Sequence, residues 1–223
     1  MGLKKKDFIE VEFTGRIKGG AIFDSNIKKD LEEAKLNIKA KPFIFSLGEG
    51  MFIKGVDDFL IGKDVGSYKI ELKPEEAFGK RNSQLVQMMP MKVFIEQKLN
   101  PTPGAIFNFD GRIAKVLTAS GGRIMVDFNH PMAGKEVVYN LNILRKIEDI
   151  NEKISALNEF LFRKDFKFDI KEKKIVMQVE KSLVKLIELF KDKFKDIFKL
   201  DLEVEEIKEA EQKTEKKESP KTQ

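Results

Sequence analysis

The sequence predicts an α+β protein with a mostly antiparallel β domain, a small β domain inserted into it, and a C-terminal α-β-β-α-β domain. The chain is rich in turn-forming residues up to Gly134, since all 15 glycines and all but one of the 7 prolines lie in this part. Short runs here alternate apolar and polar residues, which is the period of half-buried strands. Beyond about residue 150 the apolar residues recur with the period of an amphipathic helix.

The first predicted domain combines residues 1–83 with residues 130–150. Four alternating runs indicate its strands: Phe8, Val11 and Phe13; Phe43, Phe45 and Leu47; Tyr68, Ile70 and Leu72; Val137, Tyr139, Leu141 and Ile143. Gly19-Gly20 lies between two apolar runs, where paired glycines predict a hairpin turn or a β-bulge.

Residues 84–129 are predicted to form the inserted β domain. So long a structureless loop is uncommon inside a compact domain. This segment has its own turn signals at 100–104 and 120–122. It also has its own strand pattern, carried by Ile106, Phe107, Phe109, Ile113, Val116, Ile124, Val126 and Phe128.

Residues 151–205 are predicted to form the C-terminal interaction domain. Its predicted elements are a helix through Ile150, Ile154, Leu157, Phe160 and Leu161; a hairpin through Phe166, Phe168, Ile170, Ile175, Met177 and Val179; a helix through Leu183, Leu186, Ile187, Phe190, Phe194 and Ile197; and a strand through Leu200, Leu202 and Val204. Phe190, Phe194 and Phe198 form a stripe that fits an internal core or the contact of a homodimer. The charged tail 206–223 lacks apolar residues that would hold it in place, so we expect it to be disordered or a frayed helix.

Composition excludes several classes of site. Without cysteine the chain has no disulfide, thiolate metal site or cysteine nucleophile. His130 is the one histidine, so we expect no metal and no cofactor. The 42 basic and 37 acidic residues are interspersed, as on a solvated surface rather than a specific nucleic-acid interface. No apolar stretch is long enough to cross a membrane, and we expect a cytoplasmic protein.

Two short motifs are weak. Gly48-Glu-Gly50 with Gly55 resembles a phosphate-binding loop, but no Lys-Ser/Thr pair follows, so a nucleotide site is not predicted. His130-Pro131 fits a ligand or a catalytic base, and it also fits a hydrogen-bonding residue beside a proline turn. We favour the structural interpretation.

Several separated motifs, in order, resemble the FK506-binding-protein (FKBP) family of peptidyl-prolyl isomerases. They are Val11–Gly15, Ile22–Ser25, Lys41–Gly48, Met51–Asp58 and Lys73–Gly79. The insertion after Gly79, the segment Asp127–Lys135 and the run Val137–Leu141 are similar to the SlyD-type branch, in which an insert-in-flap domain interrupts the isomerase. With a further C-terminal domain, the chain resembles an archaeal long-type member. The resemblance implies a half-barrel antiparallel sheet with a short helix.

The resemblance also implies a catalytic pocket that rotates X-Pro bonds. Its residues would be Phe13, Phe23, Asp24, Phe43, Phe52, Ile53, Val56, Phe78 and Tyr139. The chain has Phe13 and Phe78 where many members have tyrosine, and Val56 where the floor of the pocket is tryptophan. Without the resemblance, the same aromatic residues would be interpreted as ordinary core.

A methionine-rich segment in the insertion is the second functional signal. Flexible, polarisable methionine side chains can pack against many apolar sequences. We expect Leu85, Val86, Met88, Met89, Met91, Phe94 and Ile95 to bind clients or, in part, to fill the core of the small domain. The predicted partners are unfolded or partly folded polypeptides and proline-containing peptides. The alternatives are a catalytically weak holdase chaperone that keeps the isomerase fold, and a nucleic-acid-associated protein that uses its lysine-rich surface.

Overall fold

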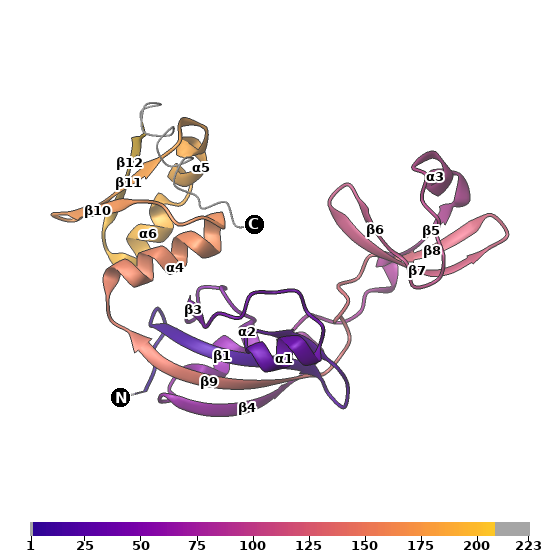
Figure 1. Cartoon of the computed structure of the whole chain (residues 1–223), viewed down its shortest axis with the longest axis horizontal. Helices are drawn as coiled ribbons and strands as arrows, with labels where there is room; N and C mark the ends of the chain where they lie inside the picture. The colour runs from indigo at the N-terminus through magenta and orange to yellow at the C-terminus, as the bar shows by residue number, and fades with distance from the viewer. Residues whose placement is uncertain (1, 208–223) are drawn as a thin grey trace, which may run out of the picture. The chain divides into compact units, whose positions relative to one another are not determined.

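The computed structural model describes residues 2–207 (Figure 1). These residues form two compact units. The first unit contains Glu10–Phe43 and Phe52–Lys146, and the second contains Lys5–Ile9, Ile44–Met51 and the chain from Ile147 onward. Among the described residues, no helix has both the length and the hydropathy needed to span a membrane. The predicted tail lies outside the described residues, apart from its first two positions.

A five-stranded sheet carries the strands predicted for the first domain. Its order is β2-β1-β9-β4, with β3 also pairing with β1. The strands are β1 (Phe8–Ile17), β2 (Ile22–Ser25), β3 (Phe43–Ser46), β4 (Gly66–Leu72) and β9 (Val137–Ile147). The pairs β1–β2 and β4–β9 are antiparallel. Every second residue of β9 from Val137 to Ile143 is buried, as the alternation predicts.

Short helices and one tight turn complete this part of the chain. The helices are α1 (Lys28–Glu33), α2 (Lys54–Leu60), and the 3₁₀ turns η1 (Pro74–Glu76) and η2 (Ser83–Leu85). The predicted glycine turn joins β1 to β2: Ile17 N–H donates to the Ala21 carbonyl over 3.0 Å, and Gly19 has φ +70°. The register shifts between Gly15 and Arg16, which pair with Asp24 and Ile22, so the extra residue Phe23 marks a bulge in β2.

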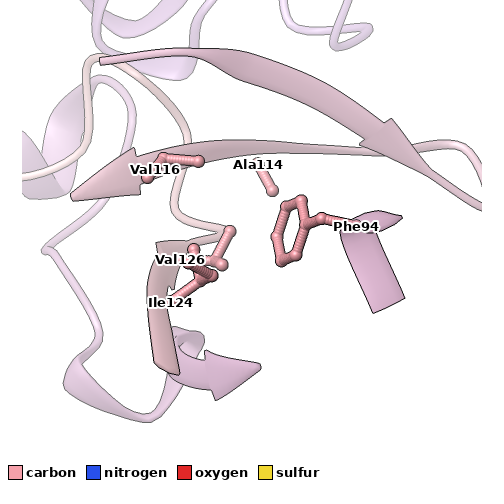
Figure 2. Packing of buried hydrophobic residues seen from close by; sticks show 5 residues of the cluster. All are labelled: Phe94, Ala114, Val116, Ile124 and Val126. Atoms are coloured by element: carbon pink, nitrogen blue, oxygen red, sulfur yellow. The ribbon is translucent and has the colours of Figure 1, made fainter. Parts of the chain in front are cut away.

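The segment 86–127 forms its own four-stranded sheet in the order β5-β8-β7-β6. Its elements are β5 (Val86–Pro90), α3 (Met91–Glu96), β6 (Ile106–Phe109), β7 (Arg112–Ser120) and β8 (Arg123–Asp127). All strand pairs are antiparallel. Figure 2 shows Phe94 of α3 pointing at the strand residues of one face, and these five residues form a fully buried core: Phe94, Ala114, Val116, Ile124 and Val126.

The C-terminal part forms a three-stranded sheet with helices. Its elements are α4 (Ile150–Phe162), β10 (Phe168–Lys171), β11 (Lys174–Val179), η3 (Lys181–Leu183), α5 (Val184–Glu188), α6 (Lys191–Phe198) and β12 (Asp201–Glu206). β10 and β11 are antiparallel, whereas β11 and β12 are parallel. Asp149 caps α4, because its Oδ1 accepts the N–H groups of Asn151 and Glu152. Mixed α/β structure with antiparallel sheets and few helices is therefore confirmed.

Three predicted details of the C-terminal part are wrong. The second predicted helix is broken between α5 and α6, because Phe190 turns to pack against Phe162 at 5.2 Å while Phe194 is buried. Phe166 precedes β10 and packs against Phe162 instead of joining the strand. Glu206 belongs to β12 rather than to the tail, since the strand extends along β11. The phenylalanine stripe makes internal contacts, and the homodimer stays a prediction.

Candidate active site

Six aromatic rings from six separate segments meet in the first unit. We call them the aromatic cluster: Phe13, Phe23, Phe43, Phe52, Phe78 and Tyr139. Tyr139 lies at its centre, with ring centroids 5.6 Å from Phe52 and 5.8 Å from Phe23, both edge-to-face. These are the distances and angles that aromatic pairs prefer.

The outer rings also contact one another. Phe13 lies 4.9 Å from Phe52, and Phe43 lies 5.9 Å from Phe52. On the other side of Tyr139, Phe23 lies 5.5 Å from Phe78 at 82°. The structure therefore brings together all six aromatic residues that the sequence analysis assigned to the pocket.

The aromatic cluster has a buried layer and a partly exposed layer. Tyr139 and Phe13 are 1% and 6% exposed, so they form the buried layer. The other four rings are half-buried and present apolar surface to solvent. Of the two predicted aliphatic members, Ile53 is half-buried at the N-cap of α2, whereas Val56 has no exposed surface.

Gly15 is a residue of this site that the sequence analysis missed as a participant. A Cβ atom at this position would lie 2.9 Å from both Cε1 and Cζ of Tyr139, and 3.0 Å from Cζ of Phe23. Real Cβ atoms do not approach ring carbons so closely, so the backbone of β1 requires glycine here. A glycine inside a strand pattern is a sequence signal for close approach, and VEFTG carries it.

His130 is the second residue whose place the sequence did not reveal. Its ring stacks on Phe78 with centroids 4.7 Å apart and planes 3° apart. Its Nδ1 accepts the N–H of Met132 over 3.2 Å, which agrees with the predicted hydrogen-bonding role. His130 therefore supports one wall of the aromatic cluster from the segment that returns from the inserted sheet.

Two ionisable groups of the site have raised pKa values. Burial raises the pKa of the Asp24 carboxyl, although a hydrogen bond from the Ser25 backbone opposes this. Burial and the charge of Asp24 raise the pKa of the Tyr139 phenol well above its usual range. Tyr139 is therefore a hydrogen-bond donor throughout the physiological pH range, next to a carboxylate in a poorly hydrated environment.

Replacing Asp24 by asparagine should change how stability depends on pH. The folded wild type holds the Asp24 proton more tightly than the unfolded chain, so its free energy of unfolding falls as pH rises above the ordinary value of 3.8. The Asp24→Asn variant has no carboxyl group at this position, so its free energy of unfolding does not fall for this reason. The difference in unfolding free energy, variant minus wild type, should therefore increase between pH ~3 and pH ~7, as measured by urea denaturation. A difference that stays constant over this range would contradict the assignment.

The residues predicted to bind clients divide between the two faces of the inserted sheet. Phe94 is core, and Met89 and Met91 pack against that core, while Leu85 and Val86 are half-buried. Met88 is 58% exposed and pairs across strands with Met125, so both lie on the face opposite the core. Ile95 is exposed on α3.

The sequence analysis missed two isoleucines on this face. Ile106 and Ile113 are 63% and 59% exposed. Phe107 and Ala114 pair with each other on the core face, so the neighbouring Ile106 and Ile113 lie on the other face of the sheet. We call Met88, Ile106, Ile113 and Met125 the outer face of the inserted sheet. Strand alternation and register, rather than composition, identify it.

Comparison with known proteins agrees with this geometry. Residues 2–95 match the model of the FKBP-type peptidyl-prolyl cis-trans isomerase family, and residues 87–132 match that of the FKBP26 IF domain. A short-type peptidyl-prolyl cis-trans isomerase of Methanocaldococcus jannaschii is 29% identical over 145 residues, which cover 63% of this chain and 92% of the relative.

Two bacterial relatives extend the comparison. The FKBP-type 16 kDa peptidyl-prolyl cis-trans isomerase of Escherichia coli K12 is 32% identical over 110 residues, or 47% of this chain and 73% of the relative. SlyD of Pasteurella multocida is 27% identical over 162 residues, or 70% of this chain and 74% of the relative. The chain belongs to the FKBP-type peptidyl-prolyl cis-trans isomerase family and is SlyD-like.

Proposed function

We propose that the chain accelerates rotation about X-Pro bonds in proline-containing peptides and in unfolded or partly folded polypeptides, and that the aromatic cluster is its catalytic site. The observation that carries this proposal is the arrangement of four half-buried rings over the buried Phe13 and Tyr139. A proline ring has a compact apolar surface that matches such an environment.

The chemistry requires no bond to be cut. Rotation about an X-Pro bond is slow because it breaks amide resonance, at a barrier of about 18–20 kcal/mol. The planar amide has a large dipole that water stabilises, and the twisted amide has a smaller one. Surroundings of aromatic rings therefore favour the twisted form over the planar form. Each tenfold acceleration requires only about 1.4 kcal/mol of this preference.

Tyr139 and Asp24 supply the polar part of the proposed site. The Tyr139 phenol stays protonated, so it leaves the buried layer of the site uncharged. Asp24 is half-buried on β2 beside this phenol and is suited to orient the peptide. Phe23, Phe43, Phe52, Ile53 and Phe78 would enclose the proline ring. Val56 would support them from inside α2.

We also propose that the outer face of the inserted sheet binds unfolded chains. Its two methionines and two isoleucines offer adaptable apolar contacts with little sequence preference. Binding of a client there keeps its prolyl bonds close to the catalytic site of the same molecule. The resulting high local concentration raises the rate of isomerisation without new contacts at that site. In this division of labour, residues 1–83 and 130–150 act as the isomerase domain, residues 84–129 as the chaperone domain and residues 151–205 as an interaction domain.

Refolding of a protein whose folding is limited by proline isomerisation tests the proposal. We expect the refolding rate to increase in proportion to substoichiometric amounts of the full chain, because one molecule acts on many clients. The alternative holdase predicts suppressed aggregation with no acceleration. An assay without a coupling protease avoids cleavage of the chain itself, and an unchanged rate in that assay would count against the enzyme.

A further inference from the structure

The segment that joins two rings of the aromatic cluster belongs to the second compact unit. Residues 44–51 group with the C-terminal part of the chain, whereas the flanking Phe43 and Phe52 belong to the first unit. Their rings lie 5.9 Å apart, and both contact Phe13. Segment 44–51 is therefore the stretch of chain that links these two rings.

The turn within this segment is flexible by composition. Gly48 and Gly50 have φ values of +74° and +69°, and they flank Glu49. Glycine is the residue type that adopts such angles without strain, and it also gives the unfolded loop the most freedom. The Gly48-Glu-Gly50 motif, which resembled a phosphate loop, is thus a turn with a glycine of high backbone freedom on each side of Glu49.

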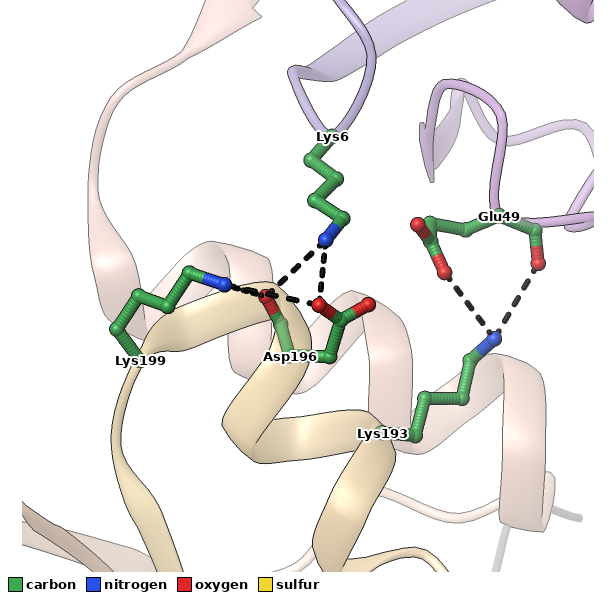
Figure 3. A network of polar contacts seen from close by, with 5 residues as sticks. All are labelled: Lys6, Glu49, Lys193, Asp196 and Lys199. Atoms are coloured by element: carbon green, nitrogen blue, oxygen red, sulfur yellow. Dashed lines mark hydrogen bonds and ion pairs between the residues drawn. The ribbon is translucent and has the colours of Figure 1, made fainter.

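Helix α6 contacts this turn. Figure 3 shows Lys193 reaching Glu49, with its Nζ 3.3 Å from the backbone carbonyl and 3.4 Å from Oε2. The Glu49 side chain is only 11% exposed and that of Lys193 29%, so solvent screens this pair less than an ordinary surface pair. The ammonium group holds both the backbone and the side chain at the apex of the turn.

A second set of contacts secures the base of the segment. The Leu47 N–H donates to the Asp7 carbonyl, and the Lys6 N–H donates to the Leu47 carbonyl, both over 2.9 Å. Lys6 in turn donates to Asp196 of α6, with Nζ 2.6 Å from Oδ1 (Figure 3). Ile44 and two residues of α6, Ile197 and Phe198, also pack against the buried cluster of Phe8, Ile147 and Ala156.

We propose that α6 is a positioning element for catalysis, with Lys193 holding the 48–50 turn and thereby the spacing of Phe43 and Phe52. This inference deepens the proposed function and rests on it for its catalytic consequence. The sequence alone assigns the C-terminal domain no part in the chemistry. The contacts of α6 give it one, because they fix a glycine-rich loop that continues directly into the cluster.

The test replaces Lys193 by methionine in the full chain, which keeps the alkyl stem and removes the ammonium group. Lys195→Met is the matched control, since Lys195 lies on the same helix and pairs with Asp201 of the adjoining strand instead. Lys193→Arg is the conservative variant expected to restore the wild-type behaviour. We expect Lys193→Met to lower kcat/KM on a short proline peptide by about threefold to tenfold, because small displacements of positioning groups reduce rates steeply.

Tyrosine NMR provides a readout that does not depend on activity. The chain has two tyrosines, and the Tyr139 ring lies 5.6 Å from Phe52, whereas Tyr68 contacts Phe59. Lys193→Met should shift the Tyr139 ring signals and leave those of Tyr68 in place, and Lys195→Met should shift neither. An unmoved Tyr139 signal, or an equal shift in both variants, overturns the positioning role. If the wild type proves inactive, the proposed function fails, and the Tyr139 signal still decides whether α6 positions Phe52.

Discussion

Removing the inserted sheet should lower the acceleration of proline-limited protein refolding by about 100-fold, while kcat/KM toward a short peptide stays within about twofold. The reason is that the outer face is proposed to concentrate unfolded chains, whereas a short peptide would need only the proposed site at the aromatic cluster. The measurement compares the two substrates with the full chain and with the deletion variant.

The junction of the insert makes this deletion feasible. Asn82 N–H donates to Asn129 Oδ1 over 2.8 Å, and Asn129 Nδ2 donates to the Asn82 carbonyl over 2.9 Å. The two crossing segments are therefore adjacent, and a short glycine linker can replace residues 83–128. His130 must be retained, because its ring supports Phe78.

A milder variant separates client binding from the loss of a domain. Met88→Ser combined with Ile113→Ser removes apolar surface from the outer face and leaves the core of Figure 2 intact. Asn108→Ser combined with Lys115→Ser is the matched control on the same face, because Asn108 pairs with Ile113 and Lys115 with Ile106. Equal losses of refolding and peptide activity in the deletion variant would contradict the division of labour, as would equal effects of the two surface variants.

Gly15→Ala should reduce kcat/KM toward a short proline peptide by about tenfold to 100-fold. The added methyl group would lie 2.9 Å from two ring atoms of Tyr139 and 3.0 Å from Phe23, and Tyr139 is too well buried to move aside freely. Overpacking of this kind costs about 1–3 kcal/mol of stability. The measurements are peptide kinetics, the free energy of unfolding and the Tyr139 ring signals.

A second variant distinguishes displaced rings from lower stability. Ile143→Val removes one methylene from the same strand as Tyr139, at a cost of about 0.5–1.5 kcal/mol. It should leave kcat/KM within about twofold at a temperature where both proteins are folded. If Gly15→Ala retained wild-type kcat/KM, the close packing around Tyr139 would have no role in catalysis.

Much of the fold follows from local patterns. Strand alternation predicts the buried positions of β9, and the capping side chain of Asp149 lies where α4 begins. The break between α5 and α6 was not predictable, since Phe190 leaves the helical stripe to meet Phe162, which is distant in sequence. Tertiary packing overrides helical periodicity there.

In the candidate site too, local patterns predicted some features, whereas others depend on tertiary packing. Motif order assigned the six rings to one place, yet Gly15 and His130 entered only through three-dimensional distances to Tyr139 and Phe78. The residues predicted to bind clients were assigned by methionine content, and this mixed Phe94 of the core with Met88 of the surface. Register between strands, which the sequence does not state, separates the two.

The hydrogen-bonded asparagines at the base of the insert make this position suitable for exchanging the inserted domain. The two hydrogen bonds between Asn82 and Asn129 hold the ends of the insert next to each other, whatever sequence lies between these two residues. A foreign recognition module whose ends lie equally close can therefore be grafted at this point. We expect such a graft to change which polypeptides the protein binds while the host sheet and the aromatic cluster stay as they are.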